Sequence, residues 1–156
     1  MKEILEKVTS SDVFKKWKKE DNYLASFFFM NEWSVDFYSP KTKKITSFLV
    51  KESGIEKNKE EKAFQKEEKN VEELKLDEIK ISLDEAKKII NKIKKEKAPQ
   101  EDLTKEIIIL QKKKTPIWNM TYITSSFNVL NIKINAINKE VLETKFEPIF
   151  SMKKTT

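Results

Sequence analysis

The chain contains no cysteine, no histidine and one glycine, Gly54, and all 32 of its basic residues are lysine. Without cysteine or histidine, the common zinc sites and Ser–His or Cys–His catalysis are excluded. Without arginine, no guanidinium group is present for bidentate recognition of carboxylate, phosphate or guanine. One glycine cannot form the glycine-rich loops that bind nucleotide phosphates. We therefore expect neither a metal nor any other cofactor.

The composition nevertheless supports a folded protein. The 156 residues suffice for one ordinary domain or two small ones. Hydrophobic residues make up 38% of the chain, which is enough for a core, while the charged fraction of 37% exceeds that of an ordinary globular domain. No apolar run approaches the roughly 20 residues of a membrane span, and the start lacks the apolar segment of a signal peptide. We expect no membrane span, and a cytoplasmic location if the native protein begins here.

The first part of the chain predicts helix followed by strands. Ile4, Leu5 and Val8 lie at helical spacing, and N-cap candidates in residues 9–12 precede a second helical stretch that carries Trp17. Alternating apolar and polar residues then predict three strands, at residues 23–30, 33–39 and 45–52.

The second part of the chain repeats this order after a polar stretch. Residues 53–70 are almost entirely charged or amide residues, which predicts a solvated linker or a polar helix. Ser82 and Glu85 form a capping-box pattern that starts a helix, and Ala98 with Pro99 ends it. Four strands are predicted after it, at residues 105–111, 117–124, 127–136 and 141–150. Helix and then antiparallel strands, twice over, indicates an α+β fold with helices on one face of a sheet.

Two turns support an internal duplication, with one unit at residues 1–52 and the other at residues 71–156. Residues 39–45 and 135–141 resemble each other, and each joins two alternating strands. An alternative register aligns residues 33–38 with residues 118–123. We prefer the turn register, because turn chemistry is less degenerate than strand alternation.

These residues resemble PepSY-like domains, in which a helix precedes strands, an aromatic residue precedes the last hairpin, and a short turn of fixed pattern closes that hairpin. Trp118 lies 17 residues before the second turn and Tyr23 lies 16 residues before the first. Lys43 and Lys139 stand where the family usually has glycine. The resemblance implies two divergent copies of a cystatin-like helix-on-sheet unit. Because Tyr23 and Trp118 have matched spacing to the two turns and alternate with polar neighbours, we expect each to be buried under the helix of its own unit. Members of the family are mostly secreted or membrane-attached and are linked to peptidase propeptides.

Aromatic residues form the first candidate binding site. Phe27 and Phe29 alternate with Phe28 and Met30, so the strand is apolar on both sides. Such a strand is either buried on both faces or exposes a patch that binds a partner. We favour burial, because a small domain needs its aromatic residues in the core. The candidate aromatic face is formed by Trp33, Phe28 and Trp118.

Carboxylates provide little indication of catalysis. The acidic residues of the charged stretch, residues 53–70, lack the low dielectric that a catalytic cleft provides. Asp36 is the acid that interrupts an otherwise apolar strand, and its alternation predicts that it faces solvent. We therefore predict no catalytic residues and no enzymatic activity.

A lysine-rich stretch is the second candidate site. Residues 86–114 hold ten lysines and four acids, a net charge of +6 that equals that of the whole chain. The candidate basic patch consists of Lys87, Lys88, Lys92, Lys94, Lys95, Lys97, Lys112, Lys113 and Lys114. These side chains either attract a phosphate backbone or an acidic protein surface, or form a solvated helix face and hairpin tip. We favour the solvated surface.

The sequence thus predicts a non-enzymatic module that binds a protein or peptide, through an exposed sheet edge or an open sheet face. The alternative is a lysine-rich protein that associates with nucleic acid without sequence specificity. Salt distinguishes the two, because phosphate binding weakens steeply as salt rises and apolar packing does not.

Overall fold

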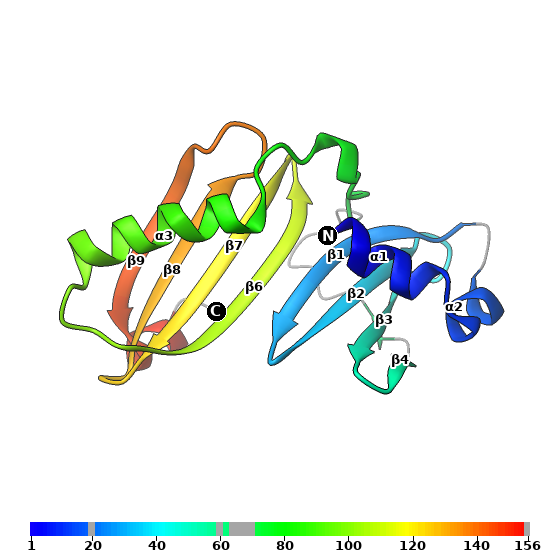
Figure 1. Ribbon diagram of the computed structural model, residues 1–156, viewed down its shortest axis with the longest axis horizontal. Coiled ribbons are helices and arrows are strands. Elements are labelled where there is room, and N and C mark those ends of the chain that lie inside the picture. Colours follow the sequence, from blue (N-terminus) through cyan, green and yellow to red (C-terminus); the bar gives the residue numbers. More distant parts are fainter. Residues whose placement is uncertain (19–20, 59–60, 63–70, 155–156) are drawn as a thin grey trace.

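A computed structural model describes residues 1–18, 21–58, 61–62 and 71–154, and it is an α+β protein in which one antiparallel sheet carries its helices on one face (Figure 1). The helices are α1 (Lys2–Thr9), α2 (Asp12–Trp17) and α3 (Leu83–Lys97), with 3-10 turns η1 (Leu76–Glu78) and η2 (Ile149–Lys154). The strands are β1 (Tyr23–Met30), β2 (Glu32–Ser39), β3 (Lys44–Lys51), β4 (Gly54–Lys57), β5 (Glu61–Lys62), β6 (Leu103–Lys113), β7 (Thr115–Thr124), β8 (Asn128–Asn135) and β9 (Val141–Pro148). The predicted fold class is therefore confirmed.

Side-chain caps start two of the helices where the sequence predicts them. At α2, the hydroxyl of Ser11 accepts a hydrogen bond from the N–H of Phe14. At α3, the N–H of Glu85 donates to the Ser82 hydroxyl at 3.1 Å, and the N–H of Ser82 donates to the Glu85 carboxylate at 2.9 Å. These bonds satisfy N–H groups that have no partner within the helix.

The strands form one sheet in the order β4-β3-β2-β1-β6-β7-β8-β9, and β5 also pairs with β3. The strands that follow α2 and those that follow α3 meet where β1 pairs antiparallel with β6. In this pairing Phe27 lies opposite Leu110 and Phe28 lies opposite Ile109. Because successive side chains of a strand point to opposite faces, the first pair faces the helices and the second faces away.

Part of the predicted linker belongs to the sheet. Residues 54–57 and 61–62 form β4 and β5 and pair with β3, so at these positions the prediction of a linker or polar helix is wrong. Residues 59–60 and 63–70 of that stretch lie outside the described residues. Gly54, with φ of +131°, makes the tight return from β3, and Ile55 packs against the core. Charged side chains are common on edge strands, where they discourage further pairing, so their abundance here concealed a strand.

The core lies between the helices and one face of the sheet. Phe14 of α2 packs on Phe37 and Phe48, with ring centroids 5.0 and 5.4 Å away. Beneath the entry to α3, Trp118 is fully buried, and its indole N–H donates to the carbonyl of Ile81 at 2.9 Å. One continuous cluster of buried side chains joins both regions.

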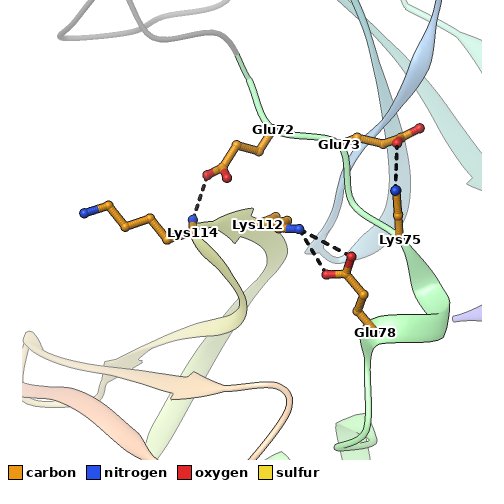
Figure 2. Close-up of polar contacts among 6 residues, drawn as sticks. All are labelled: Glu72, Glu73, Lys75, Glu78, Lys112 and Lys114. Carbon is orange, nitrogen blue, oxygen red and sulfur yellow. Dashed lines mark hydrogen bonds and ion pairs between the residues drawn. The ribbon is translucent and has the colours of Figure 1, made fainter.

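The segment that leads from the first strands into α3 is fastened to the tip of the β6–β7 hairpin (Figure 2). The carboxylate of Glu78 pairs with the ammonium of Lys112 at 3.1 Å. The carboxylate of Glu72 accepts a hydrogen bond from the backbone N–H of Lys114 at 2.7 Å, while the Lys114 side chain points away (Figure 2). Leu74, between these contacts, is buried and donates its N–H to the carbonyl of Leu24. The segment thus bridges the two parts of the sheet.

The two similar turns share one backbone geometry. The backbone N–H of Lys43 donates to the backbone carbonyl of Ser39 at 2.8 Å. The backbone N–H of Lys139 donates in the same way to the carbonyl of Asn135 at 3.1 Å. The backbone of both lysines lies in the left-handed region, with φ of +56° for Lys43 and +69° for Lys139. The order of elements, however, puts Trp33 on β2 and Trp118 on β7, each on the second strand after its helix. The turn geometry thus matches the turn register and the strand order matches the alternative register, so both registers and the duplication itself stay predictions.

Tyr23 does not occupy a position equivalent to that of Trp118, which corrects the expected burial of this pair. It lies opposite Tyr38 on the face turned away from the helices, because the register of β1 shifts between Leu24 and Ser26. Tyr23 is partly exposed, and its hydroxyl donates to the carbonyl of Val71.

Replacing Lys43 with glycine should stabilise the fold. A left-handed backbone costs an L-residue about 1–2 kcal/mol, whereas glycine adopts it freely and loses only about 0.5–1 kcal/mol of extra chain entropy. We expect Lys43→Gly to raise the free energy of unfolding by roughly 0.5–1 kcal/mol in a urea titration. Lys41→Gly, in the same turn but without a positive φ, is the control and should lower it. A lower free energy of unfolding in both variants would contradict backbone strain at Lys43.

Candidate protein-binding face of the sheet

The face of the sheet turned away from α1, α2 and α3, here called the distal face, carries large apolar side chains at its middle. Phe28 lies directly opposite Ile109 across the β1–β6 pairing. Met30 and Ile107 follow two residues further along the same two strands, and therefore on the same face. Ile117 lies on β7, next to β6, and Leu49 lies on β3, which β2 separates from β1. We define the apolar centre as Phe28, Met30, Leu49, Ile107, Ile109 and Ile117.

The apolar centre is accessible, which corrects the expectation that the strand carrying Phe27 is buried on both faces. Phe27 is fully buried on the helix side, but Met30 is 40% exposed and the other members of the apolar centre are partly exposed. The cause is the one-sided placement of the helices, since α1, α2 and α3 all pack on the opposite face (Figure 1).

Ion pairs flank the apolar centre on both sides. On the side of β3 and β4, Lys51 pairs with Glu56 at 3.0 Å. On the side of β8 and β9, the carboxylate of Glu143 pairs with Lys133 at 2.8 Å and with Lys145 at 3.0 Å. An apolar middle with a polar margin is the usual composition of a protein–protein interface.

The three residues of the predicted aromatic face do not come together. Trp118 is fully buried in the core. Trp33 is partly exposed on the helix side, where its ring lies 5.2 Å from that of Phe29. Phe28 alone lies on the distal face. Alternation assigns a face within each strand, but only the pairing between strands relates those faces to one another.

Asp36 lies on the side of the sheet that alternation predicted, but it is only partly exposed, because two neighbouring side chains bond to it. It lies on the distal side of β2, and hydroxyls from the two neighbouring strands donate to its carboxylate: Ser26 at 2.8 Å and Ser47 at 2.6 Å. Burial raises the pKa of Asp36, and the two hydrogen bonds offset part of that effect. This arrangement joins three strands by side-chain hydrogen bonds.

The candidate basic patch is divided in space. The N-terminal end of α3 lies near the start of β7, because Ile81 and Pro116 both bond to Ala136, whereas the segment after its C-terminal end reaches the β7–β8 turn, where Glu101 accepts from Asn128. The lysines of the β6–β7 hairpin tip and those of the last turn of α3 therefore lie at opposite ends of the sheet (Figure 1).

Acidic partners reduce the free charge of the basic patch further. The ammonium of Lys87 lies 3.5 Å from the carboxylate of Glu106, and Lys112 pairs with Glu78. The described residues thus show no single surface formed by all nine lysines. Lys88, Lys92 and the lysines near the end of α3 are typical of a solvated helix face.

Comparisons with known proteins returned no match: no family model, no curated protein and no solved structure is similar to the chain. The resemblance to PepSY-like domains therefore stays a prediction. In the part of the chain that the structure describes, no cluster of acidic residues could hold a metal ion, and no helix is long and apolar enough to cross a membrane.

Removing the charge of Asp36 should stabilise the fold at neutral pH. A folded-state pKa above the unfolded value of about 3.9 means that ionisation destabilises the fold. This destabilisation is absent below the unfolded pKa and fully present once the pH exceeds the folded pKa. Asp36→Asn keeps one acceptor oxygen for a serine hydroxyl and offers an N–H to the oxygen of the other, so its melting temperature should exceed that of the parent at pH 7. The difference should shrink as the pH falls toward about 4.

Asp21 supplies the matched control. The hydrogen bond from the Ser39 hydroxyl lowers the pKa of Asp21, and the backbone N–H of Lys41 contributes in the same direction. Asp21→Asn should therefore lower the melting temperature at pH 7, the opposite sign to Asp36→Asn. If Asp36→Asn melted at a lower temperature than the parent at pH 7, the raised pKa of Asp36 would be contradicted.

Proposed function

We propose that this protein is a non-enzymatic module that binds a protein or peptide, and that the distal face is the contact surface. The observation that carries the proposal is the accessible apolar centre between two ion-paired margins. Large apolar side chains are costly to leave in water, at roughly 25 cal/mol for each Å². A partner that covers the apolar centre removes this cost.

The position of the apolar centre supports a preformed binding surface. Phe28 and Ile109 belong to the two central strands, β1 and β6, which are paired on both edges. Their backbones are held by hydrogen bonds to neighbouring strands and by the core on the other side. A rigid surface loses little conformational entropy when it binds, so more of the contact energy is available as affinity.

The alternative function, non-specific association with nucleic acid, is less favoured. Phosphate binding without arginine depends on closely grouped lysines. Here the lysines lie at two ends of the sheet, and Lys87 and Lys112 already pair with acids. The capture experiment that follows, made at low and moderate salt, distinguishes protein binding from nucleic-acid binding.

A lysine placed in the apolar centre should weaken partner binding without unfolding the protein. Ile107→Lys introduces a charge that must be desolvated under a partner, and we expect affinity to fall at least about tenfold. The measurement is affinity capture from the native host, with the parent and variant proteins compared at low and moderate salt.

Lys88→Glu on the exposed surface of α3 is the control and should bind like the parent. Equal thermal melts of the two variants would show that both are folded. The proposal fails if Ile107→Lys captures the same partner as the parent. If Lys88→Glu fails to capture the partner, and the parent also loses the partner when the salt is raised to a moderate concentration, the partner is instead nucleic acid or an acidic surface.

A further inference from the structure

The strand β9 is an edge strand of the sheet, and the described residues include no strand on its outer side. Three of its apolar side chains are accessible, with Val141 exposed by 41%, Leu142 by 43% and Phe146 by 38%. The outer N–H and C=O groups of an edge strand form a template for another strand.

Exposed apolar side chains gather at this edge. Of the seven large hydrophobic residues that are exposed in the described part of the chain, three lie on β9 and three lie beside it. Phe127 is in the β7–β8 turn, Ile137 is in the β8–β9 turn, and Phe150 follows β9 in η2. Phe127 and Phe150 are exposed by 67% and 74%. Such a concentration of exposed apolar side chains along an unpaired edge is typical of an interaction surface.

We propose that this strand is a second copy of β9, paired antiparallel about a two-fold axis at Thr144. This surface shares Glu143 and Lys145 with the margin of the distal face but contains no residue of the apolar centre, so the inference does not depend on the proposed function. In this register Glu143 lies opposite the partner's Lys145, and Leu142 lies opposite the partner's Phe146. Each contact occurs twice, as the symmetry of an isologous dimer requires. Opposite charges and apolar pairs directly across two strands are the combinations that stabilise a sheet.

Moving the two-fold axis by one residue in either direction gives unfavourable contacts, and this places the axis at Thr144. With the axis at Lys145, that lysine meets the partner's Lys145, and Glu143 meets the partner's Glu147. With the axis at Glu143, that carboxylate meets the partner's Glu143. Like charges directly opposite each other destabilise a strand pair. The sequence of β9 is thus self-complementary about Thr144 among these three registers.

The extent of the pairing is limited, so the dimer should depend on concentration. The register of β9 against β8 shifts at Leu142, and Pro148, which has no N–H to donate, ends the strand. A stable dimer buries about 1,200–2,000 Å² in total, and a short edge contact falls at the weak end of the range. Pairing would place the two sheets edge to edge and join their distal faces.

A single cysteine at the axis tests the register, because the native chain has no cysteine. At Thr144 the two Cα atoms would lie about 4.5–5.5 Å apart, within the range of about 4.4–6.8 Å that a disulfide spans. Val141→Cys is the matched control, since it is also exposed but lies three residues from the axis. Its two copies would be separated by about 20 Å, from 3.4 Å per residue. Thr144→Cys should therefore form covalent dimers at least ten times faster than Val141→Cys under mild oxidation.

Sedimentation of the cysteine-free protein provides the second measurement. The parent should dimerise as its concentration rises, and Leu142→Lys should remain monomeric with a melting temperature close to that of the parent. Equal cross-linking rates at positions 144 and 141 would overturn the two-fold register. A parent protein that stays monomeric at millimolar concentration would overturn the self-association.

Discussion

The arrangement of this protein depends on the antiparallel pairing of β1 with β6. That pairing joins the strands that follow α2 to those that follow α3, and it sets the face on which every side chain of the two strands lies. Phe27 and Leu110 meet on the helix side, where both are fully buried. A slip of one residue would exchange them with Phe28 and Ile109 and remove the centre of the core. One register therefore produces both the core and the distal face.

The one-sided helical layer explains the surface that remains. With α1, α2 and α3 on the same face, the opposite face is left without a helical cover, yet its central residues are as apolar as those of a buried strand. The segment that carries Leu74 and Glu78 holds the two parts of the sheet together from the side (Figure 2). The distal face and the β9 edge are consequences of this arrangement, and they suggest two separate surfaces for association.

Much of the fold could be predicted because its signals are local. The capping box of Ser82 and Glu85, the N-cap at Ser11 and the alternation of most strands all act over a few residues, and each is found where the sequence placed it. The strand around Gly54 could not be predicted, because its charged residues resemble a linker. It forms since β3 offers an unpaired edge, and that edge is a property of the sheet rather than of the strand's own sequence.

The candidate sites depended on contacts between distant residues, and here the sequence was a weaker guide. Composition alone determined that this chain has no cysteine, histidine or arginine chemistry, and periodicity determined an α+β fold with amphipathic helices. Tertiary structure decided that Trp118 is buried while Phe28 is accessible, and that the hydroxyls of two serines bond to Asp36. It also decided that the lysines separate to two ends of the sheet. The physical reason is that alternation specifies two faces for each strand, whereas strand pairing and the position of the helices determine which of those faces water reaches.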